Sequence, residues 1–479
     1  GLGTPDLKAA RLLEQAAFGP TPAALARVRQ MGADAWLAEQ FLMPETAIPD
    51  PGTGGMNNSV MQAQYLNRLS AAPDQLRQRV AYALGQIIVV SMNKNNYPNE
   101  VIPYLQTLNR NAFGNYRTLL GEIATSPQMG KYLDMANSNK PGMGGGANEN
   151  FARELLQLFT IGLVKLNPDG TVVAGPGGAP IATYDQTAVT QLALAFTGWT
   201  YAGPGNNNWE NFSGPLQPRE VNHDTSAKRF LGCSLPAGQS AQSDLTAALD
   251  CVFAHPNVAP FISLRLIRSL VTSNPSPAYV ARVSAVFNNN GSGVRGDLRA
   301  VVRAVLLDAE ARNDVATVNG GRLKDPIFHV VSLVRALGGS VSPTNQQAWS
   351  LSRLGETPLT PPSVFSFYSP LFRVPHTALA GPEFQICSPT EAVLRGNLLM
   401  GIVSNPGPDF PIDITRFVNL AGHVAGLIDA VDQTLLYGRM PAAMRQSLAT
   451  AIAAQPDNRN KALTALYLTL LSGQYAVQH

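Results

Sequence analysis

The sequence has few charged residues. Asp, Glu, Lys and Arg make up 14% of its 479 residues, and the formal net charge at pH 7 is +3. Average proteins contain roughly 25%, so Asn, Gln, Ser, Thr and Gly must cover much of this surface, as is more typical of exported proteins. A nucleic-acid groove needs a basic stripe, and no run of Lys and Arg with interleaved aromatics occurs. The sequence therefore predicts no nucleic-acid partner.

Long apolar runs are also missing. The longest lies near Gly85–Met92, far short of the ~18 residues that a membrane helix needs, so we expect no membrane span. The opening residues, Gly1–Asp6, do not have the pattern of a signal peptide. We therefore expect a mature or trimmed form of a periplasmic or secreted protein.

Only three cysteines are present, Cys233, Cys251 and Cys387. The first two flank a turn followed by the start of a helix. In an exported protein they would form a disulfide, which closes a loop worth about 3 kcal/mol in the chain-entropy description. The alternative is a pair of buried thiols. In the disulfide interpretation Cys387 is free.

Motifs for several chemistries are absent. There is no C-x-x-C, no H-E-x-x-H and no closely spaced His pair, which argues against zinc. There is no G-x-S-x-G and no S-x-x-K at a helix start, which argues against a serine nucleophile. The glycine-rich loop at 142–146 lacks the Lys of a phosphate loop, and its glycines suit a flexible flap. We expect no cofactor, with calcium held by Asn148, Asp169 and Asp224 left open.

Apolar residues recur at helical spacing along most of the chain. The clearest case is 73–92, where Leu76, Val80 and Leu84 share one face. Thr21-Pro22 and Asp185 have the pattern of helix starts. An Asn-Pro-Asp-Gly turn at 167–170 predicts a small β-hairpin. With no linker or charge run, we predict a mainly α, single multi-helix domain over 1–479, with an irregular loop insertion at 202–242 and a Pro- and aromatic-rich loop region at 340–388.

The stretch 129–201 is the richest in chemistry-bearing side chains. In its N-E-N-F-A-R-E segment Asn148 is a candidate N-cap, and Glu149 lies where a helix dipole favours an acid. Glu149 and Arg153 are four residues apart, as are Asn150 and Glu154, so each pair shares a face. Glu149 and Glu154 are about 140° apart around the axis. A second carboxylate must come from elsewhere, and Asp134 is the nearest candidate.

Two functional interpretations follow. In the first, the chain is an exported polysaccharide-active enzyme, a glycoside hydrolase or lyase, with Glu149 or Glu154 as general acid and Asp134 or Asp185 as the second carboxylate. The order of Glu-bearing helix, hairpin and helix resembles lysozyme-like glycosidases, an analogy of fold alone. In the second, the acids and Arg153 form a structural ion-pair network in a non-catalytic exported binding or assembly protein.

The first interpretation predicts a carbohydrate polymer or oligosaccharide as partner, and the second a co-exported protein. Aromatic rings, among them Trp209, would stack on sugars unless they belong to the core. His223 and Asp224 are an acid/base or metal-binding pair in one reading; in the other, Asp capping and a His hydrogen bond pin a loop. The candidate substrate-binding residues are Tyr132, Asn137, Asn150, Arg153, Asp185, Trp199, Tyr201, His223 and Asp224.

Several segments together resemble the DUF1800 family, bacterial proteins without an assigned function. They include RLLEQAAFGPT, RQRVAYALGQIIVVS, NENFARELLQLFTIG, AFTGW, NHDTSAKRFLG and RLKDPIFHVVSLVRALG. The resemblance covers most of the chain and implies a mainly helical exported protein. Family members usually start the helix before TGW with Tyr-Thr-x-x-Asp. Here Asp185 takes the cap position and Ala188 that of the acid, which favours a capping role for that acid over a catalytic one.

Overall fold

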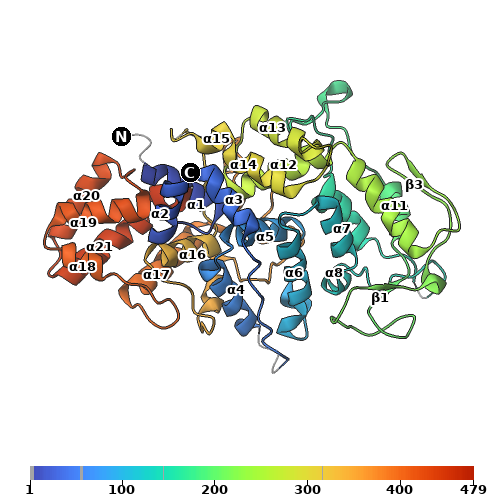
Figure 1. The fold of residues 1–479 in the computed structure, drawn as a ribbon, viewed down its shortest axis with the longest axis horizontal. Coiled ribbons are helices and arrows are strands. Elements are labelled where there is room, and N and C mark those ends of the chain that lie inside the picture. Colours follow the sequence, from blue (N-terminus) through green and yellow to red (C-terminus); the bar gives the residue numbers. More distant parts are fainter. Residues whose placement is uncertain (1–4, 54–57, 144, 316) are drawn as a thin grey trace.

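The computed structural model describes residues 5–53, 58–143, 145–315 and 317–479. The fold is mainly α-helical, as the sequence predicts (Figure 1). The α-helices of the first half of the chain are α1 (Pro5–Ala16), α2 (Pro22–Met31), α3 (Ala33–Leu42), α4 (Ser59–Ala71), α5 (Gln75–Ile87), α6 (Ile102–Asn111), α7 (Tyr116–Ala124), α8 (Pro127–Tyr132), α9 (Asn150–Glu154) and α10 (Gln186–Ala195).

The second half contains one group of helices before residue 340 and another after residue 388. The first group is α11 (Ala241–Ala254), α12 (Val258–Leu270), α13 (Pro277–Asn288), α14 (Leu298–Leu307), α15 (Ala309–Arg312) and α16 (Pro326–Ala336). The second group is α17 (Pro389–Ser404), α18 (Thr415–Leu420), α19 (Val424–Val431), α20 (Ala442–Ala453), α21 (Asn458–Leu470) and α22 (Gly473–Ala476).

The strands of the described residues form three small two-stranded antiparallel sheets. They pair β1 (Trp199–Thr200) with β2 (Gln217–Pro218), β3 (Lys228–Phe230) with β4 (Cys233–Leu235), and β5 (Arg322–Leu323) with β6 (Val477–Gln478). The last pair brings the C-terminal end of the chain back to the residues just before α16.

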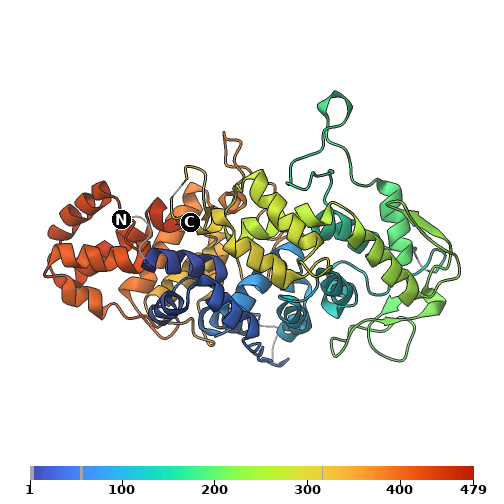
Figure 2. The same ribbon diagram turned by 45° about the horizontal axis from the view of Figure 1, so that its top comes forward.

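The hairpin predicted at Asn-Pro-Asp-Gly forms as an arm with isolated bridges. Leu166 pairs with Val172, and Val164 pairs with Ala182. The Asp169 carboxylate accepts hydrogen bonds from the backbone N–H and the hydroxyl of Thr171, which fixes the turn. In both ribbon views this arm is the blue-green loop that projects from the body of the molecule (Figure 1 and Figure 2).

Short helical turns fill the segments between the longer helices. The 3₁₀ turns are η1 (Met92–Lys94), η2 (Pro98–Val101), η4 (Pro176–Gly178), η5 (Glu220–Asn222), η6 (Ala348–Leu354) and η7 (Pro382–Ile386), and the π-helical turns are η3 (Leu155–Thr160) and η8 (Asp432–Leu436). The region 202–242 thus carries β2, η5, the β3–β4 hairpin and the first residues of α11 within irregular chain, and the helical turns of 340–388 are η6 and η7.

Most buried apolar side chains fall into two large clusters. One gathers residues of α1, α3, α5–α14 and the loops between them. The other gathers residues of α4, α16 and the C-terminal helices α17–α21, which lie at one end of the molecule (Figure 1). Burial of this apolar surface supplies the main favourable term in folding.

Helix starts follow the capping rules where a suitable side chain is present. The Thr21 hydroxyl accepts the backbone N–H of Ala24, with Pro22 in the first turn, and the Asp185 carboxylate accepts that of Ala188. Both starts were predicted, and both are confirmed. The segment 98–114 forms η2 and α6. Pro98 opens η2, and Pro103 lies in the first turn of α6, where a missing N–H is tolerated.

Taken singly, no helix of the described ranges is long and apolar enough to cross a membrane. Helices α11 and α12 meet the length and composition requirement only together, and the pair is bent by 74° at the break between them.

Candidate functional site

The segment after α8 holds two polar residues in the left-handed backbone region. Asp134 has φ 56° and Asn137 has φ 61°. Asp and Asn tolerate this conformation better than other residues with a Cβ, and such residues often lie at functional sites. Both are exposed. The segment therefore presents a carboxylate and an amide on the surface between α8 and α9.

Glu149, and not Asn148, is the residue that precedes the first turn of α9. Its side chain makes no capping hydrogen bond. The Asn148 amide oxygen instead accepts the backbone N–H of Asn150 at 2.9 Å. The prediction of Asn148 as N-cap is thus displaced by one residue, because a two-residue Asx-type bond replaces the usual cap.

The Glu149 carboxylate is held by three donors from two helices. Arg153 Nη2 lies 2.8 Å away, Gln186 Nε2 lies 2.9 Å away, and the Thr190 hydroxyl lies 3.0 Å away. The predicted pairing of Glu149 with Arg153 is confirmed. Donation from Gln186, with that from Thr190 and the charge of Arg153, lowers the pKa of Glu149. This carboxylate is ionised at neutral pH and ties α9 to α10.

Glu154 lies in a different environment. It is half-buried, and its Oε2 is fully buried without a hydrogen-bond partner. Burial raises the pKa of Glu154, and the nearby charge of Arg153 offsets this only in part. The same carboxyl raises the pKa values of Tyr132 and Tyr184, after burial of those phenols. Glu154 is thus a partly dehydrated acid beside two phenol groups.

Asp134 approaches the face of α9 that carries Glu154. The Asn150 amide donates to Asp134 Oδ2 at 2.8 Å, and Asn150 lies four residues before Glu154, so their side chains share a face of the helix. Asp134 is exposed. The structure thus brings an exposed carboxylate and a half-buried carboxyl to one side of α9, with Glu149 bound to α10.

The predicted aromatic platforms are mostly core residues. Tyr132, Trp199 and Tyr201 are each less than 10% exposed, so the structure gives no support to their prediction as sugar-stacking residues. Burial is explained by their elements: Tyr132 ends α8, and Trp199 pairs with β2. Trp209 differs, because its side chain is 91% exposed.

Trp209 lines an open cleft of about 630 Å³. Two further aromatic rings, Tyr97 and Phe212, lie in its wall, and Tyr97 is 45% exposed. Carboxylates and amides complete the lining, namely Asp50, Asn96, Asn99, Glu100 and Glu210. Exposed rings beside carboxylates and amides offer the flat apolar surface and the hydrogen-bonding groups that a sugar requires.

Lys131, whose side chain is 9% exposed, binds two acids in the wall of this cleft. Lys131 Nζ lies 3.1 Å from Glu100 Oε2 and 2.7 Å from Glu210 Oε2. The Asn96 amide donates to Glu210 at 3.1 Å. Because Lys131 belongs to α8, the cleft adjoins the segment that carries Asp134. The loop that carries Trp209 is joined to the Asp134 segment as well, because the Asn137 amide donates to the Asn208 carbonyl at 3.1 Å.

The cleft and the α9 acids remain separate features of the surface. Five pockets of the described chain have linings that include none of Glu149, Glu154 and Asp134. Sequence reasoning missed Tyr97, Glu100, Lys131 and Glu210. Of these four residues, only Lys131 could have been found from the sequence, because it lies three residues before the candidate Asp134.

A family match covers nearly the whole chain. A model of the family described as "Protein of unknown function (DUF1800)" matches residues 11–477. The chain belongs to the DUF1800 family. No curated protein matches, and no solved structure matches. The predicted family membership is confirmed.

The family segment NHDTSAKRFLG forms a buried ion cluster. His223 Nε2 and Lys228 Nζ lie 3.0 and 2.8 Å from the same Asp244 oxygen, and all three side chains are at most 1% exposed. Asp224 accepts the backbone N–H of Ser226 at 2.9 Å and lies 3.3 Å from Lys228. This geometry matches the loop-pinning alternative, and His223 has no surface with which to contact a substrate.

The remaining candidates of this DUF1800 chain have local partners. Arg153 forms an ion pair with Glu149, and Asp185 caps α10. The three calcium candidates lie in different local turns, in which Asn148, Asp169 and Asp224 accept backbone N–H groups. In the described part of the chain, no group of three His, Cys, Asp or Glu side chains is placed to hold a metal ion.

The predicted disulfide joins Cys233 and Cys251, with a Cα–Cα distance of 6.3 Å. It ties β4 to α11. Cys387 is free, as expected.

The family segment RLKDP supplies a second buried charge cluster that sequence reasoning missed. Asp325 and Glu356 each accept one backbone N–H at the start of α16, from Phe328 at 2.9 Å and Ile327 at 2.8 Å. The Tyr82 hydroxyl lies 2.9 Å from Asp325. Burial and the neighbouring Asp325 raise the pKa of Glu356, whereas Arg322 lowers that of Asp325 against the effect of burial.

The α16 N-terminus and Arg322 therefore favour the charged form of Asp325, whereas burial beside Asp325 favours the neutral form of Glu356. Both are 0% exposed. A charged R-L-K-D run directly before an apolar helix was the available signal, and it indicates a structural cluster.

Proposed function

We propose that this DUF1800 chain is an exported polysaccharide-active enzyme, a glycoside hydrolase or lyase, in which Glu154 is the general acid. The observation that supports this most is the half-buried Glu154 carboxyl on the side of α9 that the exposed Asp134 carboxylate approaches. A general acid must hold its proton near neutral pH, which partial burial favours for Glu154. Two acids in different environments, one partly buried and one exposed, are the usual arrangement for divided acid and base roles.

The second carboxylate in this proposal is Asp134. It is exposed and therefore hydrated, and Asn150 orients it toward the Glu154 face of α9. In an inverting hydrolase it would activate water, in a retaining one it would attack the sugar, and in a lyase it would take a proton. Glu149 has a supporting role, because three donors already occupy it.

The cleft at Trp209 would hold the flanking sugars of the polymer. It adjoins the Asp134 segment through Lys131 and Asn137. A polysaccharide spans several binding positions, so the chain would cross the cleft and reach α9. The rings supply stacking surface, and Asn96, Asn99 and Glu210 supply hydrogen bonds to hydroxyl groups.

A second candidate function is that of a non-catalytic exported binding or assembly protein. The bonds of Glu149 to Arg153, Gln186 and Thr190 favour it, because they use the acid to join α9 and α10. In that case the Trp209 cleft alone would bind carbohydrate or a co-exported protein.

A product-release screen distinguishes the two candidate functions. The protein is incubated with bacterial and plant polysaccharides, including uronic-acid polymers, and both new reducing ends and unsaturated products are measured. Release of reducing ends without unsaturation indicates a hydrolase, and unsaturated products indicate a lyase. Binding without release from any polymer supports the binding protein.

A further inference from the structure

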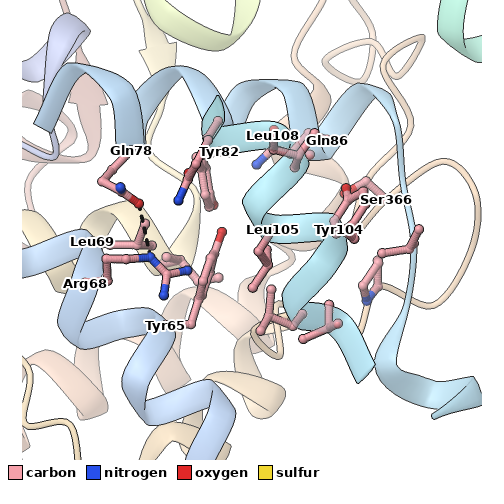
Figure 3. A pocket seen from close by; sticks show the side chains of 18 of the residues that line it. Tyr65, Arg68, Leu69, Gln78, Tyr82, Gln86, Tyr104, Leu105, Leu108 and Ser366 are labelled. Carbon is pink, nitrogen blue, oxygen red and sulfur yellow. Dashed lines mark hydrogen bonds between the residues drawn. The ribbon is translucent and has the colours of Figure 1, made fainter. Parts of the chain in front are cut away.

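A small cavity lies between α4, α5 and α6, well away in sequence from the acids of α9. Its volume is about 60 Å³. Figure 3 shows Tyr65 and Arg68 of α4, Gln78 and Tyr82 of α5 and Leu105 of α6 converging on it. One water needs about 10–15 Å³ measured in this way. The cavity therefore has room for a few water-sized groups.

Arg68 brings to this cavity a positive charge without a direct ion-pair partner, because Asp74 reaches it only through the Gln78 side chain and Glu45 acts only at a distance. The residue is 4% exposed, and its Nε donates to the Gln78 side-chain oxygen at 3.2 Å. Its guanidinium lies 5.5 Å from the ring centre of Tyr65. Nη1 is buried without a hydrogen-bond partner, and no carboxylate of the described residues forms an ion pair with Arg68. Buried charges are normally paired, because an unpaired one is costly.

Further unpaired donors line the same cavity. Asn109 is 3% exposed and its amide nitrogen has no partner, and the Gln86 amide nitrogen is likewise buried without one. No Asp or Glu belongs to the lining, and Asp325 and Glu356 lie behind the Tyr82 hydroxyl. The polar atoms left unpaired here are all donors. Apolar side chains such as Ala81, Leu105 and Leu108 form the remaining wall.

We propose that this cavity is a binding site for a small monocarboxylate, such as formate or acetate, with Arg68 as its counter-charge. A carboxylate accepts from a guanidinium and from amide donors at once. Its short alkyl end fits the apolar wall, and its few heavy atoms fit the volume. The site is distinct from the α9 acids and from the Trp209 cleft, so it does not depend on the proposed enzymatic function.

The test is thermal denaturation and isothermal titration of the whole chain with formate, acetate, acetamide and chloride at matched ionic strength. Acetamide has the shape of acetate without its charge. We expect saturable binding and a raised melting temperature with formate and acetate only. An equal effect of acetamide or chloride, or no binding of either carboxylate, would overturn the proposal and leave a cavity that holds water.

Two variants locate the site. Arg68→Gln removes the counter-charge and is expected to weaken acetate binding at least tenfold. Ala81→Leu fills the cavity and leaves Arg68 in place, and it should also abolish binding if the ligand lies there. The second variant keeps the test decisive if Arg68→Gln folds poorly. Full acetate binding by folded Ala81→Leu would contradict the assignment.

Discussion

Glu149 and Glu154 lie at the two ends of one short helix, and their pKa values are displaced in opposite directions. Donors from Gln186, Thr190 and Arg153 lower the pKa of Glu149. Burial raises that of Glu154. A single turn of α9 therefore presents an ionised carboxylate toward α10 and a dehydrated acid toward Tyr132. This division makes the two residues separable by experiment.

The two acids should have opposite effects on the pH dependence of stability. Glu149 has a lowered pKa in the folded protein. It therefore contributes stability above its ordinary pKa of 4.5, and this stability is lost as the pH falls through the folded pKa. Glu149→Gln should therefore lower the free energy of unfolding at pH 7, by about 1 kcal/mol or less for so exposed a pair, and the difference should shrink in acid.

Glu154 has a raised pKa in the folded protein, so its effect on stability is the opposite. Its contribution to stability is fully present below pH 4.5 and is lost as the pH rises through the folded pKa. Glu154→Gln should therefore match the wild type in acid and become relatively more stable toward pH 8. Chemical denaturation at several pH values measures both variants, with Glu45→Gln, at an exposed acid, as the control. The same sign for both variants would refute the assigned environments.

The Asp244 cluster should be far more important for stability than a surface ion pair. Asp244→Asn leaves Lys228 and His223 buried without their carboxylate, and breaking such a pair costs about 3–5 kcal/mol. The matched control is Asp250→Asn, because Asp250 is 63% exposed beside Arg117 and should cost about 1 kcal/mol or less. Urea denaturation compares them, and equal losses would contradict the assigned role.

The Cys233–Cys251 disulfide should stabilise the β4–α11 region. Replacing both cysteines by Ser is expected to lower the free energy of unfolding by about 2–4 kcal/mol, because the denatured chain gains freedom. Cys387→Ser is the control and should respond to reductant as the wild type does. If a reductant left the wild-type melting temperature unchanged, this prediction would be wrong.

Trp209 should matter for binding and not for folding. Its side chain is 91% exposed, so Trp209→Ala should keep the melting temperature while polymer affinity falls roughly tenfold, a loss of ~1.4 kcal/mol. Trp349→Ala is the control, because Trp349 is 50% exposed elsewhere, beside Arg353. Affinity electrophoresis in polysaccharide gels measures both, and equal retardation of the two variants would remove Trp209 from the site.

Local chemistry made the helix starts and the disulfide predictable. Thr21-Pro22 and Asp185 act through bonds to the next three residues, so the sequence contains the whole cause. The displaced cap of α9 and the π turn after it are different. In that π turn Thr160 donates to the Leu155 carbonyl five residues back, and the apolar side chains of the turn are buried.

Features that depend on contacts between separate segments of the chain could not be predicted from the sequence. The Trp209 cleft joins residues near 50, 96–103 and 209–213, which no periodicity relates. The burial of Trp199 and Tyr201 depends on β2 and on Phe212, both within the irregular region 202–242. Asp134, Asn150 and Glu154 could nonetheless be chosen as candidates from the sequence, because they lie in one stretch of the chain.

The most direct test of the account is the rate of product release by Glu154→Gln on whichever polysaccharide the wild type degrades. Glutamine keeps the shape of the side chain and cannot donate a proton, so a folded variant should lose about 10²–10⁴-fold in rate, while Glu45→Gln keeps it. A wild type that releases nothing from any polymer, or a Glu154→Gln protein as active as the wild type, would contradict the role assigned to Glu154.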